Sequence, residues 1–156
     1  MKKIKLILFL VLISQFCFSQ TKEETVEWLN SKLANYAPFD GKFEIEIVYY
    51  PEYGETLLIT KHFRFGASSA DMHYSFKPDA ITSLNLTAHN NTNGQLSIEI
   101  ISSTKRIFYE KKEFIGDIVL MFDGPKEEIT KINKGILHLL SLMGNTISPK
   151  KEYFND

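Results

Sequence analysis

The sequence predicts an α+β fold: an N-terminal helix, a seven-stranded antiparallel meander that forms a bent sheet or a partly open barrel, and a C-terminal helix that closes it. Three observations predict this fold. Apolar residues recur at spacings of three and four between Thr21 and Pro38 and again between Pro125 and Gly144, which indicates two amphipathic helices. Between the helices, short segments alternate apolar and polar residues with a period of two. The connections are short, so consecutive strands are expected to pair.

Residues 1–19 have the pattern of a secretory signal peptide. Three lysines within the first five residues precede the apolar run Leu6–Ile13, which is shorter than the roughly 20 residues of a spanning helix. We expect cleavage between Ser19 and Gln20 and export to the periplasm or the medium. Two alternatives are an uncleaved membrane anchor and a lipoprotein modified at Cys17, although Ser14–Phe16 does not resemble a lipobox.

The charge balance of the mature chain excludes some classes of partner. The full sequence has 18 Lys and Arg residues and 19 Asp and Glu residues; three lysines leave with the signal peptide, so 15 remain and the formal net charge becomes −4. An acidic chain of this kind is not expected to bind nucleic acid through phosphate contacts. The mature chain has no cysteine, which excludes disulfides, thiol nucleophiles and cysteine zinc sites. We also expect no cofactor and no membrane span.

The N-terminal helix is predicted from its cap and its apolar stripe. Thr21–Glu24 forms a capping box, in which the glutamate follows the cap residue by three positions. The stripe that follows consists of Val26, Leu29, Leu33 and Tyr36, with Trp28 beside it. Pro38 ends the helix, and residues 38–41 form a turn.

Seven strands are expected between the helices, each bounded by turn residues. The hairpin dipeptide Asn-Gly lies in the polar loop before the fifth of them. The predicted strands are Phe43–Tyr50, Leu57–Phe65, Asp71–Lys77, Leu84–Ala88, Leu96–Ile100, Lys105–Glu110 and Phe114–Phe122. No internal repeat or linker divides the chain, so residues 20–147 are predicted to form one domain and residues 148–156 a flexible tail.

The C-terminal helix has the clearest helical pattern in the chain. Asp123 serves as its cap or lies just outside it, and Pro125 suits the first helical position. Gly144 supplies a left-handed C-cap. Gly135 lies on the flank of the apolar stripe, which predicts a close approach of the helix to the sheet. His138 is expected to point into solvent. The stripe consists of Ile129, Ile132, Ile136, Leu139, Leu140 and Met143.

The second and third strands suggest a metal site. If Phe63 opposes Met72 on the apolar face, then Arg64 opposes Asp71 and His62 opposes His73 on the other face. Two cross-strand histidines are potential ligands for zinc or copper. The alternative is an exposed pair of histidines beside a surface ion pair.

A tyrosine-rich turn is the second candidate site. Tyr49, Tyr50 and Tyr53 surround Pro51 between the first two strands. Aromatic side chains at the rim of a sheet or barrel can contact a ligand or a partner protein. The alternative is that they cover the end of the core.

The order of elements resembles the pleckstrin-homology-like superfold, in which a C-terminal helix plugs one end of a bent barrel. The resemblance covers Phe43 to Gly144 and rests on element order, and a shared fold does not transfer function. A helix-packed open sheet and a lipocalin-like ligand barrel are the alternative architectures. The export signal, capped helix, sheet and closing helix also look like small uncharacterised exported bacterial proteins.

No catalytic residue is predicted, because the sequence has no nucleophile elbow, zinc-protease motif, phosphate-binding glycine loop or calcium loop. The favoured function is an exported, non-catalytic domain that binds a partner protein, an envelope component or a small apolar ligand. The alternatives are a small exported enzyme or metal-binding protein that uses the histidine pair, and a purely structural or inhibitory module.

Overall fold

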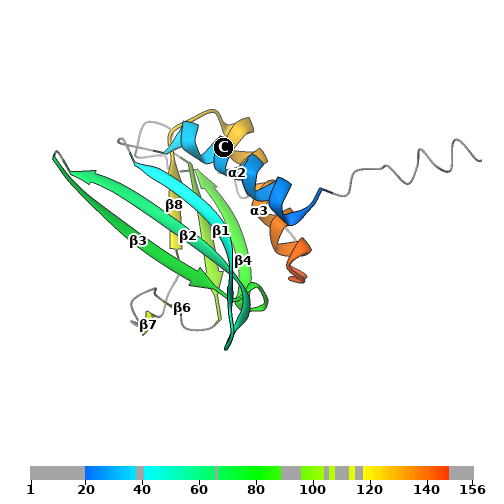
Figure 1. The fold of residues 1–156 in the computed structure, drawn as a ribbon. Helices are drawn as coiled ribbons and strands as arrows, with labels where there is room; N and C mark the ends of the chain where they lie inside the picture. Colours follow the sequence, from blue (N-terminus) through cyan, green and yellow to red (C-terminus); the bar gives the residue numbers. More distant parts are fainter. Residues whose placement is uncertain are drawn as a thin grey trace, which may run out of the picture.

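The chain folds into two helices and two antiparallel sheets, as seen in a computed structural model that describes residues 20–37, 41–65, 67–88, 96–103, 106–107, 113–114 and 118–147 (Figure 1). The predicted signal peptide and the tail 148–156 lie outside these residues. The α+β class and the antiparallel pairing are confirmed. The elements are α2 (Lys22–Tyr36), β1 (Lys42–Tyr50), β2 (Gly54–Phe65), β3 (Ser68–Phe76), the 3-10 helix η1 (Pro78–Ala80), β4 (Ile81–Ala88), β5 (Leu96–Ser102), β6 (Arg106–Ile107), β7 (Glu113–Phe114), β8 (Ile118–Phe122) and α3 (Lys126–Leu142).

The single seven-stranded meander is wrong, because the strands divide between two open sheets. One sheet has the order β1-β2-β3-β6-β7, in which β6 and β7 are two residues each, and the other has the order β4-β5-β8. The predicted seventh strand, Phe114–Phe122, contributes to both sheets, through β7 and β8. The sheets are open and do not form a closed barrel, and the alternative of a helix-packed open sheet describes the fold.

The crossover between the sheets lies at η1. Pro78 begins this short helix, and because proline has no backbone N–H it cannot extend the β3 ladder. The buried side chain of Asn145 then holds the crossover, donating from Nδ2 to the carbonyls of Pro78 and Ile81, the latter at 2.9 Å. The chain therefore leaves the first sheet after β3, and β4 pairs with β5 in the second sheet and not with β3.

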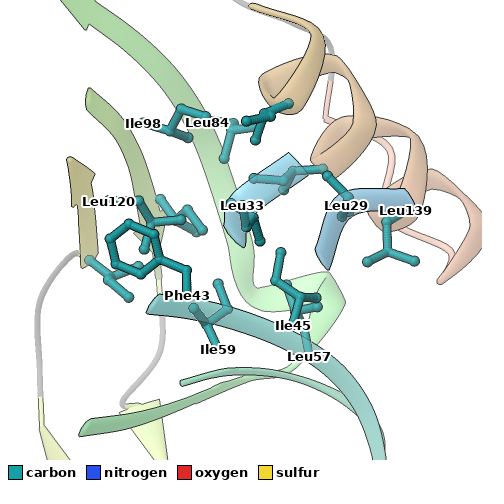
Figure 2. Packing of buried hydrophobic residues seen from close by; sticks show 14 of the residues in the cluster. Leu29, Leu33, Phe43, Ile45, Leu57, Ile59, Leu84, Ile98, Leu120 and Leu139 are labelled. Carbon is teal, nitrogen blue, oxygen red and sulfur yellow. The ribbon is translucent and has the colours of Figure 1, made fainter. Parts of the chain in front are cut away.

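The two helices and the two sheets enclose one hydrophobic core (Figure 2). α2 packs on β1 and on α3, and α3 packs on β4 and β5. Five of the six residues of the predicted α3 stripe are fully buried, and the sixth, Met143, is half-buried. At one corner the sheets touch, where the rings of Phe43 and Phe122 pack edge to face with centroids 5.5 Å apart. The space beneath α3 is therefore filled by packed side chains.

The helix ends largely follow the predictions. Thr21 Oγ1 accepts a hydrogen bond from the Glu24 amide, and the Glu24 carboxylate accepts one from the Thr21 amide, so the capping box is confirmed. Gly144 has a φ of 89°, which confirms the left-handed C-cap. α3 begins one residue later than predicted, with Pro125 as its N-cap. Asp123 lies outside the helix, and its amide donates to the carbonyl of Tyr36.

Gly135 marks a close approach between two helices, and the predicted approach to the sheet is wrong. A Cβ atom at this position would lie 2.5 Å from Trp28 Cζ3 and 2.9 Å from Leu29 Cδ2, both in α2. A larger residue at this position would therefore require the Trp28 and Leu29 side chains, or the helices that carry them, to shift.

Glu128 joins the same two helices electrostatically. Its carboxylate pairs with Lys131 in α3 and, at 2.8 Å, with Lys32 Nζ in α2. The hydrogen bonds from Lys131 and Lys32 lower the pKa of Glu128 to about 2, and the bond to Glu128 raises the pKa of Lys32.

Candidate functional site

β1 forms one edge of the first sheet, and its outer side is only partly covered. β1 pairs with β2 alone, in a continuous register that places Ile45 opposite Ile59. On the other side, the side-chain amide of Asn30 in α2 donates to the carbonyl of Ile45 and accepts from its N–H, both at 2.8 Å. The Asn30 amide thus takes the place that the backbone of a neighbouring strand would occupy.

The bonds of Ile45 reveal which other residues of β1 offer backbone groups at this edge. In an antiparallel pair, the N–H and C=O of alternate residues point to the same side of the strand. Because the backbone N–H and C=O of Ile45 point away from β2, those of Ile47 and Tyr49 do so as well. β1 is an edge strand, and among the described residues neither of these two has a backbone hydrogen bond at that side. Four backbone groups, one N–H and one C=O from each residue, are therefore available there.

A groove runs along this edge between α2 and β1. It has a volume of about 520 Å³, and we call it the strand-edge groove. Three apolar residues, which we call its apolar floor, and four glutamates, two from each wall, which we call its acidic rims, line it. The lining residues are Glu23, Val26, Glu27 and Asn30 from α2 and Glu44, Ile45, Glu46 and Ile47 from β1.

The acidic rim is mostly uncompensated. Glu44 contacts Lys42 Nζ at 3.4 Å and His62 Nε2 at 3.4 Å. Within the described part of the chain, Glu23, Glu27 and Glu46 form no salt bridge. The groove therefore presents a negative potential to solvent beside unpaired backbone groups.

The predicted tyrosine cluster is divided between different environments. Tyr49 lies two residues after the groove-lining Ile47 along β1, and it is 71 % exposed. Tyr53 is 43 % exposed and lies under Lys77, whose Nζ is 5.1 Å from the ring centroid. Tyr50 is half-buried on the other face of β1. Of the three, Tyr49 is the residue that the fold places beside the groove, and a ligand-binding role for all three stays a prediction.

The histidines do not form the predicted cross-strand pair, because β2 and β3 pair two residues away from the predicted register. His62 lies opposite Asp71, and His73 lies opposite Thr60. His62 Nδ1 is 2.8 Å from Asp71 Oδ1, and His73 Nδ1 is 3.0 Å from Thr60 Oγ1. The predicted pairing of Arg64 with Asp71 is wrong for the same reason. Phe63 likewise pairs with Ala70 and not with Met72.

The surroundings of His62 include two carboxylates but no complete ligand set. Nε2 of His62 contacts Glu44 at 3.4 Å, and the two atoms are not aligned for a hydrogen bond. Among the residues that the structure describes, no group of three or more His, Cys, Asp and Glu side chains has the arrangement of a metal site. Metal binding by His62 and His73 stays a prediction.

A second hollow, of about 400 Å³, lies between α2 and α3. Its lining includes Trp28, Lys134, Gly135 and His138, and His138 is exposed as predicted. The strand-edge groove is the stronger candidate, because it also offers unpaired backbone groups.

Sequence reasoning missed both Asn30 and the groove. An asparagine on the polar side of a predicted helix is indistinguishable from a solvated residue until the strand that it contacts has been placed. No helix within the described ranges is long and apolar enough to cross a membrane. Comparisons with protein-family models, curated proteins and solved structures found no match.

Proposed function

We propose that this chain is an exported, non-catalytic binding domain and that its ligand is a partner protein held in the strand-edge groove. The observation that carries the proposal is the edge of β1 at Ile47 and Tyr49, whose outward backbone groups have no partner among the described residues and lie beside a groove with an apolar floor and acidic rims. Proteins commonly protect or cover a sheet edge, because its backbone groups pair readily with another chain. A partner that covers this edge would satisfy those groups.

The filled core supports binding at the surface. Side chains from both helices and both sheets pack together where an interior ligand would have to lie, as Figure 2 shows for Leu33, Leu120 and Leu139. All three are fully buried. A small apolar ligand would need a lined cavity there. A partner protein needs only the exposed groove, so the packing favours the partner protein.

The proposal of export rests on the signal-peptide pattern of residues 1–19 and requires that this segment be removed. Cleavage after Ser19 would leave Gln20 as the first residue, directly before the Thr21 cap of α2. The mature domain would therefore begin where its first helix begins. The mass of the protein recovered from the periplasm or the medium tests this, and a retained N-terminal segment would contradict it.

The binding proposal is tested with a peptide of alternating valine and lysine, labelled with a fluorophore. We expect the domain to raise its fluorescence anisotropy, and to do so much less for the matching valine–glutamate peptide. Glu27→Lys should weaken binding by roughly tenfold, because it reverses a charge at the rim.

Glu127→Lys is the matched control, since Glu127 is exposed on α3 and does not line the groove. It changes the net charge by the same amount and should weaken binding far less. Equal effects of the two substitutions, or no binding of the lysine peptide, would overturn the proposal.

A further inference from the structure

We infer that the partner contributes an extended, basic segment that joins the first sheet as an additional strand next to β1. This inference rests on the proposed function and specifies the chemistry of the ligand. It is carried by the backbone of the β1 edge and by the charges on either side of it. Strand addition of this kind derives affinity from backbone hydrogen bonds and specificity from alternate side chains.

The backbone defines where the added strand pairs. Ile47 and Tyr49 present their N–H and C=O groups along the open part of the edge. The Asn30 side chain already makes hydrogen bonds with the N–H and C=O of Ile45, so the added strand ends at that point. The available edge is short, and it matches a segment of about four or five residues at the usual rise of a strand.

The side chains define the composition of the added strand. Residues of neighbouring strands that lie opposite each other share a face of the sheet. Positions on the face of Ile47 and Tyr49 would meet the apolar floor and should be apolar. The intervening positions lie on the face of Glu46 and Val48, and the position beside Glu46 should be lysine or arginine. The ligand is therefore an extended segment that alternates apolar and basic residues.

The α2 wall favours the same ligand. Val26 contributes to the apolar floor, and Glu23 and Glu27 carry negative charge on the other side of the groove. Because acidic groups flank the edge on both sides, a basic segment is attracted from either rim, and an acidic segment is repelled. Charge complementarity thus selects the partner's sequence, and backbone pairing selects its conformation.

The test uses two N-methylated versions of the valine–lysine peptide described above. One is methylated at the backbone nitrogens of the valines, and the other at the backbone nitrogens of the lysines. In an added strand, only alternate N–H groups point to β1, so one version should lose affinity by at least about tenfold and the other should bind nearly as well as the parent peptide. Hydrogen exchange at the Ile47 and Tyr49 amides should slow when the parent peptide binds.

The outcomes separate the inference from the proposed function. If the parent peptide binds but both methylated versions lose affinity equally, and the two amides remain unprotected, strand addition is wrong and groove binding survives. If the parent peptide does not bind, both are overturned. Unequal effects of methylation together with protection of the two amides support strand addition.

Discussion

Replacing Asn30 by alanine should destabilise the domain, although the residue lies on a partly exposed helix face. The side-chain amide makes two hydrogen bonds of 2.8 Å to the backbone of Ile45. Each hydrogen bond contributes about 0.5–1.5 kcal/mol net, and the groove admits water that partly replaces them. We therefore expect Asn30→Ala to lower the free energy of unfolding by about 1–2 kcal/mol, which corresponds to a fall in Tm of about 3–8 °C for a domain of this size.

The control is Asn35→Ala in the same helix. Asn35 is exposed, and its side chain donates to the carbonyl of Ser31 within α2, at 3.0 Å. Both substitutions exchange asparagine for alanine in one helix, so the gain in helix propensity cancels in the comparison. Thermal unfolding followed by circular dichroism measures the difference. Equal Tm values for the two variants would refute the reasoning.

An isosteric variant isolates the hydrogen bonds from the packing. Asn30→Asp keeps the shape and an acceptor for the Ile45 N–H, but it places a carboxylate oxygen against the Ile45 carbonyl. It also adds a negative charge to a groove that already has acidic rims. We expect it to destabilise the domain at least as much as alanine does at neutral pH, and a Tm like that of the parent would contradict the role assigned to the Asn30 amide.

Three further predictions follow from other parts of the fold. Because the pKa of Glu128 falls from 4.5 to about 2 on folding, its contribution to stability is present above pH 4.5 and is lost as pH falls toward 2. In urea unfolding, Glu128→Gln should therefore lower the free energy of unfolding more at neutral pH than near pH 2. An equal loss at the two pH values would contradict this prediction. Gly135→Ala should destabilise the protein by about 1 kcal/mol, because overpacking exceeds the helix-propensity gain, and Trp28→Ala should reduce that cost in a double-mutant cycle. Zinc binding at the predicted histidine site would move the ring NMR signals of His62 and His73 together, and unchanged signals would remove that prediction.

The sequence predicted the elements well because their signals are local. The capping box of α2, the stripe of α3 and the left-handed Gly144 all depend on residues close together in the chain, and the structure confirms each of them. The partition into two sheets is not local. Alternating strands look the same whichever neighbour they pair with, and the contact of Asn145 with η1 joins residues more than sixty positions apart.

The register error has a specific physical cause. Every side chain of β3 keeps its predicted face, because a shift of two residues preserves the alternation. Agreement of both faces therefore excludes a register that is shifted by one residue. It does not choose between registers that differ by two residues, because these place the same side chains on the same faces. The prediction that His62 faces His73 required that choice, and in the structure Phe65 pairs with Ser68, which places His62 opposite Asp71.

The glutamates of the strand-edge groove have two explanations, and these are compatible. Charges on an edge strand discourage pairing with other copies of the same protein. If two β1 edges met at Ile47 and Tyr49, the glutamates that line the strand-edge groove in both copies would be brought closer together, and like charges repel. A basic segment meets no such repulsion. Under the proposed function, the same carboxylates would oppose self-association and attract a basic partner, so removing their charge should weaken both effects. Glu46→Val tests this, because it should weaken binding of the lysine peptide and increase self-association, as measured by sedimentation; a change in only one of the two would separate the explanations.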